Sequence, residues 1–363
     1  MMYSSKICIC FIVLILCIKC TLSDNNDDYH WLFLHYHKTG HDLSRSILDA
    51  LSSLLNTTYV DNIGPRRTYY QPKNIYDIPY LKSALSVQGG GEMQFEWNKF
   101  IKLPYKIVHF VRDPFDYIIS AYLYHIQHPP PPERFVRYHR YDPCLFNSKL
   151  INHYINEFDY FHYNKTFIEN HINMTFVLCR SLFSKAPFYK ELNRLIVIDD
   201  NGNKDVTKSL KLEAVRCLIS DEIDAGADIL RMAVNSLRDK EAGNKYSKRI
   251  FLSDFSSNNS SKWNDTTINL IKFLLNNENN SQLKYLSNCM DCQQEYLNTI
   301  YKYSFIGNNN IIKNKFQFVN ENASLHTTHN MISHEKRNEY KKILLDDEIL
   351  GPLLVLLKDI ILY

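Results

Sequence analysis

A short apolar and aromatic run near the N-terminus, Trp31–Tyr36, constrains the fold of this chain more than any other feature. Its length and its aromatic content predict a buried strand. The run continues into His37–Asp42, which is short and polar and reads as a tight loop. After the loop, apolar residues recur at helical spacing, at Leu43, Ile47, Leu48, Leu51, Leu54 and Leu55. The folded part of the chain therefore begins as strand, loop and helix.

A second unit of the same kind follows. Lys106–Val111 predicts another buried strand, and Asp113 and Pro114 are suited to start a helix over Phe115–His128, which Pro129–Pro132 ends. Further strands are expected at Leu195–Ile198 and Arg249–Phe255. Further helices are expected at Leu210–Ile219, Asp221–Ala242, Trp263–Asn276, Glu335–Leu345 and Leu353–Leu362. Strands separated by helical stretches predict an α/β fold with a central, mainly parallel sheet flanked by helices.

The run Ile7–Ile18 is the one long uncharged apolar stretch among the 363 residues. As a helix it would extend roughly 18 Å, short of a hydrocarbon core of about 30 Å. This favours a signal peptide cleaved near Cys20–Ser23, although a type II membrane anchor stays open if Lys6 and Lys19 reach the lipid headgroups. Either reading assigns residues 1–23 to a leader and residues 29–363 to one domain in the secretory pathway, in the Golgi lumen, on its membrane or secreted.

Two composition features agree with that compartment. Asn-x-Ser/Thr acceptors, the mark of a glycoprotein, begin at Asn56, Asn164, Asn173, Asn258, Asn259, Asn264, Asn279 and Asn322. Outside the leader, five cysteines allow two disulfides and one free thiol, with connectivity left open: Cys144, Cys179, Cys217, Cys289 and Cys292. The pair Cys289 and Cys292 has the spacing of half a zinc site, but no second half is present in the sequence. We therefore expect a structural disulfide or core cysteines there, and no metal.

The charge balance limits the class of partner. The formal net charge is +3, and it falls to about +1 without the leader lysines. A protein that coats nucleic acid would normally carry a strongly basic domain, so no nucleic-acid partner is expected. An apolar content of 45% excludes a disordered chain. A small anionic ligand held by a few placed cations remains compatible with this composition.

The segment Lys38–Gly40 has the features of an anion-binding loop. It joins a buried strand to a helix start, where backbone N–H groups and the helix dipole attract phosphate. Gly40 lets the backbone approach the ligand, and Lys38 adds a full positive charge. The segment is not a Walker loop, because the required glycines are missing. A plain strand-to-helix turn is the competing interpretation.

A second group of polar residues follows the second strand. Arg112 stands at the strand end, and Ser120 lies eight residues later in the predicted helix. An arginine at this place can hold a phosphate with two N–H groups, and a serine hydroxyl can add a third donor. The competing interpretation is an ion pair between Arg112 and Asp116 at the helix start.

Together these segments resemble the sulfotransferases that use 3′-phosphoadenosine-5′-phosphosulfate (PAPS), in particular the lumenal carbohydrate sulfotransferases. Leu34–Gly40 is similar to the loop that binds the 5′-phosphosulfate, and Val111–Tyr122 to the segment that binds the 3′-phosphate. Weaker likeness extends to Ile250–Phe255 with Thr267–Leu275 and to the terminal stretch His334–Tyr363.

The resemblance implies a sulfotransferase fold similar to that of P-loop NTPases, with the PAPS-binding loops at the strand ends. It implies that Lys38 contacts the bridging oxygen and the 5′-phosphate as the catalytic cation, and that Thr39 and Gly40 add backbone and hydroxyl donors. Arg112 and Ser120 would hold the 3′-phosphate. The reaction implied is transfer of a sulfuryl group from PAPS to a hydroxyl acceptor, most simply a glycan.

The general base is less clearly marked. Relatives use a Glu or a His that precedes the 3′-phosphate segment, which here directs attention to Glu92 and Glu96, with Asp77 as a weaker candidate. Solvated loop carboxylates are the competing interpretation of all three. His35 and His37 flank the loop and are candidates to line the site, although His35 could equally belong to the core.

The chain departs from the family pattern just after the loop. His41 and Asp42 stand where many relatives have small or hydroxyl residues. A carboxylate beside a phosphate is unfavourable unless it caps the helix, so this departure keeps a second hypothesis open. In that alternative the chain is a non-catalytic sulfotransferase-like module that binds a nucleotide or a sulfated ligand.

Overall fold

The structure, a computed structural model, describes about half of the chain. The described residues are 30–36, 39–40, 44, 47–48, 85–88, 105–127, 144, 146, 148–184, 188–189, 194–220, 227–243, 246–256, 265–266, 269–270, 273–274 and 332–363. The predicted leader and Cys289 and Cys292 lie outside these residues. In the part of the chain that is described, no helix is both long and apolar enough to cross a membrane.

Four parallel strands form the central sheet. They are β1 (His30–His35), β2 (Leu85–Gln88), β3 (Tyr105–Val111) and β6 (Ser247–Phe251). Their order across the sheet is β2-β1-β3-β6, and every neighbouring pair is parallel. The α/β class with a central parallel sheet is therefore confirmed, and so are the strands predicted from Trp31–Tyr36 and Lys106–Val111.

Both faces of the sheet are covered, which explains why its strands are apolar almost throughout. On one face Phe33 packs near Phe110, with 6.1 Å between ring centroids. On the other face Leu34 and Val111 belong to the main core with the helices. Lys106 is buried as well, and its ammonium group donates to the carbonyl of Phe273 at 2.6 Å. The same ammonium group donates to the Leu274 carbonyl at 3.2 Å, so Lys106 is buried with its donors in use.

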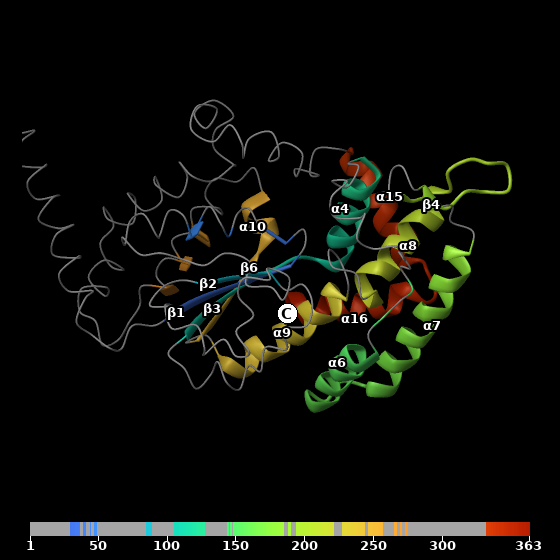
Figure 1. Cartoon of the computed structure of the whole chain (residues 1–363). Helices are drawn as coiled ribbons and strands as arrows, with labels where there is room; N and C mark the ends of the chain where they lie inside the picture. Colours follow the sequence, from blue (N-terminus) through green and yellow to red (C-terminus); the bar gives the residue numbers. More distant parts are fainter. Residues whose placement is uncertain are drawn as a thin grey trace, which may run out of the picture.

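The predicted helix after β3 is α4 (Pro114–Gln127). Its start follows from the sequence: Asp113 accepts a hydrogen bond from the Phe115 amide at 2.8 Å, and Pro114 occupies the first helical position. Figure 1 shows α4 continuing directly from the sheet into a layer of helices. That layer contains the confirmed helices α8 (Val206–Ile219), α9 (Asp228–Ala242), α15 (His334–Leu345) and α16 (Leu350–Leu362).

Two helices in the middle of the chain were not predicted, α6 (Ser148–Tyr160) and α7 (Lys165–Phe183). Their buried residues nevertheless repeat with helical spacing. In α6 these are Ile151, Tyr154, Ile155 and Phe158. The side chain of Asn164 caps α7 by accepting from the Phe167 amide. The abundance of aromatic and asparagine residues in this region hides a periodicity that is present.

The structure corrects two strand predictions. Leu195–Ile198 is not a strand of the central sheet, because β5 (Arg194–Leu195) forms a two-residue antiparallel pair with β4 (Phe188–Tyr189). The strand expected over Arg249–Phe255 ends at Phe251, where the chain turns into α10 (Leu252–Ser256). In both cases a short apolar run resembles a strand in the sequence, although some of its residues are helical or lie in turns in the structure. Its conformation is decided by the elements that neighbour it.

One disulfide ties the middle of the chain together. Cys144 is bonded to Cys179 on α7, with 5.7 Å between the Cα atoms. Cys217 on α8 is buried, and its thiol donates to the Glu213 carboxylate at 3.8 Å. The sequence left these pairings open, and the structure assigns one of them.

Candidate anion-binding site

The strand order places the two predicted anion-binding segments at the same end of the sheet, where the adjacent strands β1 and β3 terminate. β1 lies between β2 and β3, so the chain leaves β1 toward one side and returns on the other side for β3. In open α/β sheets such a reversal opens a crevice outside the carboxyl ends of the strands, where ligands bind. Leu34 pairs with His109, so Thr39 and Arg112 both follow just beyond this shared edge. The loop after β1 and the residues after β3 therefore lie at the same end of two adjacent strands.

The turn after β1 is held by its own backbone. Thr39 is fully buried, and its amide donates to the Tyr36 carbonyl at 3.1 Å. The Thr39 hydroxyl donates to the same carbonyl at 2.9 Å and accepts from the Tyr36 amide at 2.5 Å. Thr39 thus closes the turn, and in this arrangement its hydroxyl proton is used within it.

Gly40 makes the change from strand to helix possible. Its φ is +97°, in the range that favours glycine. Its carbonyl accepts the amide of Ser44 at 2.8 Å, and Ser44, Ile47 and Leu48 are helical and buried. The predicted unit of strand, tight turn and helix is therefore present at these residues. Lys38 itself lies outside the described residues.

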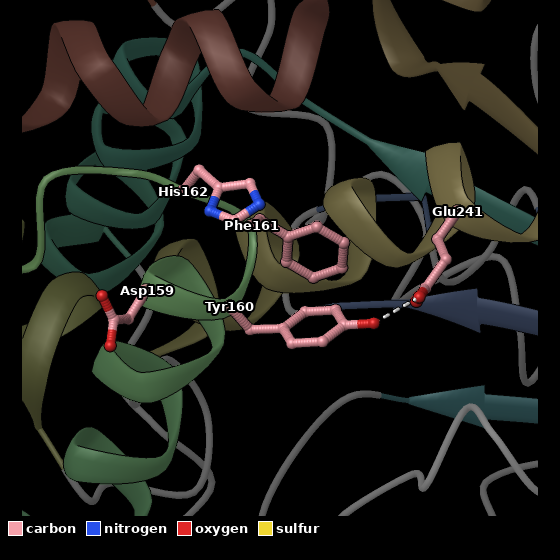
Figure 2. A pocket seen from close by; sticks show the side chains of 5 residues that line it. All are labelled: Asp159, Tyr160, Phe161, His162 and Glu241. Carbon is pink, nitrogen blue, oxygen red and sulfur yellow. Dashed lines mark hydrogen bonds between the residues drawn. The ribbon is translucent and has the colours of Figure 1, made fainter.

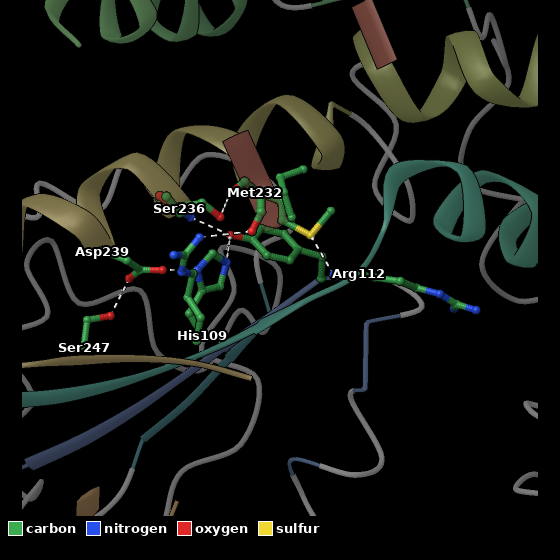
Figure 3. Close-up of polar contacts among 10 residues, drawn as sticks. His109, Arg112, Met232, Ser236, Asp239 and Ser247 are labelled. Carbon is green, nitrogen blue, oxygen red and sulfur yellow. Dashed lines mark hydrogen bonds and ion pairs between the residues drawn. The ribbon is translucent and has the colours of Figure 1, made fainter. Parts of the chain in front are cut away.

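Arg112 and Ser120 are placed by α4. Arg112 directly follows β3, two residues before α4 begins, and its amide donates to the sulfur of Met232 on α9 at 3.4 Å. Ser120 is buried two turns into α4. Figure 3 shows the Arg112 side chain pointing away from His109 and Asp239, along the direction in which the chain enters α4. Ser120 is therefore carried by α4, and Arg112 lies in the short connection between β3 and this helix.

Asp116 pairs with cations of a helix that is distant in sequence. Its two carboxylate oxygens lie 3.3 Å from Arg337 and 2.9 Å from Lys341, both on α15. Burial alone would raise the pKa of Asp116. The hydrogen bond from Lys341 and the charges of Lys341, Arg112 and Arg337 outweigh burial and hold this pKa below its usual value. The C-terminal helix α15 thus brings two cations to the start of α4.

A buried polar network lies behind the turn (Figure 3). The Tyr36 hydroxyl is 2.8 Å from Nε2 of His109 and accepts from the Asn235 amide at 2.7 Å. Nδ1 of His109 is 2.5 Å from Asp239, which also accepts from the Ser247 hydroxyl. Burial raises the pKa of the Tyr36 hydroxyl well above its usual value. Tyr36 directly precedes the loop residues, so this network fixes the strand end from which the loop departs.

Most of the network belongs to one stripe of α9. Its polar residues Asp228, Arg231, Asn235 and Asp239 are all buried and recur at helical spacing. Arg231 lies 3.2 Å from Asp228 and donates to Tyr154, while Tyr117 donates to Asp228 at 2.9 Å. Sequence reasoning missed this stripe because alternating charged residues on a helix usually face solvent. The signal that could have identified it is the set of apolar residues on the other sides of α9, which is typical of a helix buried all round: Ile229, Leu230, Met232, Ala233, Val234 and Leu237.

No protein-family model, curated protein or solved structure matches this chain. The function of the chain is therefore inferred from its residues and their arrangement. At the edge described above, the chain presents a glycine turn, a helix start and several cations. Such an arrangement can bind an anion with one or more phosphate groups.

A separate hollow of about 590 Å³ lies at the end of α6 (Figure 2). The Tyr160 ring points toward Glu241, to which its hydroxyl donates at 2.9 Å. Arg238 pairs with Glu241 at 3.1 Å and lies 5.3 Å from the ring centroids of both Tyr160 and Phe161. Glu241 is nine residues beyond Met232 on α9, or about 13 Å along the axis. The hollow is therefore remote from Arg112 and is not part of the candidate site.

The other predicted site residues have different outcomes. His35 is fully buried in β1 and belongs to the core of the sheet. The remaining candidates, Lys38, Glu92, Glu96, Asp77 and His37, lie outside the described residues, as do His41 and Asp42. Glu92 and Glu96 follow β2, whose end Gln88 pairs with His35 at the same sheet edge. Among the described residues, no group of three or more potential metal ligands is present.

Proposed function

We propose that this chain is a PAPS-dependent sulfotransferase that acts on a hydroxyl acceptor, most simply a glycan, in the secretory lumen. The observation that carries the proposal is the position of the Thr39–Gly40 turn and Arg112 beyond the carboxyl ends of the adjacent parallel strands β1 and β3. The two sequence segments that resemble the family are therefore neighbours, at the edge where such sheets bind ligands. A sulfotransferase fold of the P-loop type is part of the same proposal.

Each described residue has a defined part in this proposal. Gly40 keeps the backbone close to the 5′-phosphosulfate, and Thr39 holds the turn in shape. Arg112 donates two parallel hydrogen bonds to the 3′-phosphate, with Ser120 as a further donor. Lys38 supplies positive charge at the bridging oxygen. The residues fit a nucleotide with two separated phosphate groups, because the donors come from two segments at one edge.

PAPS, when bound, supplies an activated sulfuryl group that passes to the acceptor hydroxyl, leaving adenosine 3′,5′-bisphosphate. The protein has to align the acceptor and stabilise the negative charge that develops on the leaving oxygen. Lys38 suits that second task, because its position in the sequence puts a positive charge in the segment after β1. Glu92 and Glu96 are the proposed general bases, since both follow the strand that ends beside β1.

The compartment is supported by two described features. The Cys144–Cys179 disulfide is typical of proteins that fold in an oxidising lumen. Asn164 and Asn173, the two described glycosylation acceptors, are both exposed. These observations favour the secretory pathway over the cytosol.

The test is transfer of labelled sulfate from PAPS to a mixed pool of glycans. Wild-type protein should label the pool, whereas Lys38→Ala and Arg112→Ala should lose transfer by at least a hundredfold. Arg180→Ala, which removes an exposed arginine on α7, is the matched control and should be fully active. Binding of adenosine 3′,5′-bisphosphate without transfer to any acceptor would favour the non-catalytic module. Absence of binding would refute both.

A further inference from the structure

The helix α15 packs against α4 at the residues assigned to the phosphate. Asp116 and Ser120 are four residues apart on α4 and so share one side of this helix, and Arg112 stands two residues before its start. From α15, Arg337 and Lys341 meet this side at Asp116. Since Arg337 and Lys341 are also four residues apart, α15 presents both cations on one face. A segment more than 200 residues away in sequence thus completes the surroundings of Arg112.

Arg337 has donor capacity that the described part of the chain leaves unused. Its side chain is 7% exposed, and one guanidinium nitrogen lies 3.3 Å from Asp116. The other terminal nitrogen, Nη2, is buried and has no hydrogen-bond partner among the described residues. Leaving a buried donor without an acceptor is unfavourable, and more so for a charged group. A phosphate oxygen is an acceptor that would remove this cost.

The charges around Asp116 also call for an anion. Three cations of the C-terminal helices pair with the start of α4: Arg337, Lys341 and Lys358. They meet two carboxylates there, Asp116 and Asp113. Burial lowers the pKa of Arg112 to about 10, and the positive charge of Arg337 adds to this effect while Asp116 opposes it. A bound dianion would favour the charged form of both arginines.

We propose that Arg337 is a ligand of the same phosphate group assigned to Arg112 and Ser120, so that α15 closes the 3′-phosphate subsite. This inference rests on the proposed function and extends it to a residue outside the two segments that resemble the phosphate-binding loops of the family. Two guanidinium groups from different elements would then hold the phosphate, and Lys341 would keep Asp116 from repelling it. Selectivity for nucleotides that carry a 3′-phosphate would depend on the C-terminal helix.

The experiment compares two nucleotides that differ only in the 3′-phosphate, adenosine 3′,5′-bisphosphate and adenosine 5′-monophosphate. Their dissociation constants are measured by calorimetry on the full chain. Wild type should prefer the bisphosphate, and Arg337→Ala should weaken bisphosphate binding about tenfold or more while leaving monophosphate binding unchanged. Arg337→Lys should recover part of the loss. Lys336→Ala removes the neighbouring exposed cation, which pairs with Glu339, and should match wild type.

A second variant separates ligand binding from a purely structural role. Asp116→Asn removes the ion pair that holds Arg337 but also removes a negative charge near the phosphate. If Arg337 binds phosphate, Asp116→Asn should bind the bisphosphate at least as tightly as wild type. If Arg337 only anchors α15, Asp116→Asn should weaken binding as Arg337→Ala does, which would overturn the inference.

The outcomes also separate this inference from the proposed function. Loss of bisphosphate preference in Arg112→Ala but not in Arg337→Ala would overturn the role of Arg337 and leave the proposed function standing. Equal weakening of both nucleotides in Arg337→Ala would overturn it as well, because the effect would not concern the 3′-phosphate. A wild-type protein without preference for the bisphosphate would refute the proposed function and this inference together.

Discussion

Nδ1 of His109 lies 2.5 Å from the Asp239 carboxylate, a contact between the middle of β3 and the end of α9. Both side chains are almost fully buried. His109 uses its other nitrogen for the Tyr36 hydroxyl, so one imidazole joins the helix layer to the strand that leads into the candidate loop. The polar network therefore supports the site from behind and is part of the core rather than a solvent-exposed cluster.

Replacing His109 by leucine should destabilise the protein strongly. The change leaves the Asp239 carboxylate and the Tyr36 hydroxyl in a buried position with a partner removed, and breaking such a pair costs on the order of 3–5 kcal/mol. Urea unfolding measures the difference. His109→Gln keeps one hydrogen-bonding group and should lose less. A loss below about 1 kcal/mol for His109→Leu would contradict the network as described.

Arg112→Lys tests the geometry of phosphate binding rather than its charge. Lysine keeps the positive charge but cannot donate two parallel hydrogen bonds. We expect affinity for adenosine 3′,5′-bisphosphate to fall roughly tenfold, and Arg112→Ala to lower it further. Calorimetric titration checks both. Equal affinities of the lysine variant and wild type would show that the site recognises charge alone.

The ion pairs of Asp116 should make stability depend on pH in the acid range. The folded-state pKa of Asp116 is lowered, so the ionised carboxylate stabilises the fold above the unfolded pKa of about 3.9. This stabilisation is lost as the pH falls below that value through the folded pKa. Asp116→Asn should therefore be less stable than wild type at pH 7, by about 1–2 kcal/mol, and the difference should shrink toward pH 3.

Urea unfolding of both proteins at pH 7 and pH 3 measures this effect. Asp159→Asn removes an exposed carboxylate 4.0 Å from Lys165 and serves as the control, with little effect at either pH. A difference between wild type and Asp116→Asn that stayed constant with pH would refute the role of the ionised carboxylate.

The Cys144–Cys179 disulfide should contribute substantially to stability. It closes a loop with a sequence separation of 35 residues, for which the chain-entropy model gives about 4 kcal/mol. Thermal unfolding should shift to lower temperature when dithiothreitol is added to wild type. The double variant Cys144→Ser with Cys179→Ser should show the lower temperature without reductant and no further shift with it. A reductant effect of equal size in the double variant would assign the stabilisation elsewhere.

Gly40→Ala tests the turn itself. At φ +97° an alanine is strained by about 1–3 kcal/mol, so the turn should shift. We expect weaker nucleotide binding together with a modest loss of stability. Gly202→Ala is the matched control, because Gly202 has a similar φ of +81° with open space around it and lies in the turn before α8. That variant should lose similar stability but keep its nucleotide affinity.

Much of the fold could be predicted because it depends on local patterns. The strands at Trp31–Tyr36 and Lys106–Val111 are continuous apolar runs, which two covered sheet faces require. The start of α4 follows from Asp113 and Pro114, whose capping chemistry is local. The end of β6 at Phe251 could not be predicted, because Leu252–Ser256 is equally apolar and its helical conformation depends on what surrounds it.

For the candidate site, the sequence by itself determined the chemical types and their order: a strand, a glycine turn with a lysine, and an arginine after a second strand. Only the tertiary structure decided that the turn and Arg112 are neighbours, because strand order is set by how helices pack on the sheet and not by local spacing. The same holds for Arg337 and for the buried stripe of α9. Charged residues at helical spacing look solvent-exposed in a sequence, and burial becomes apparent only when their partners on distant elements are in place.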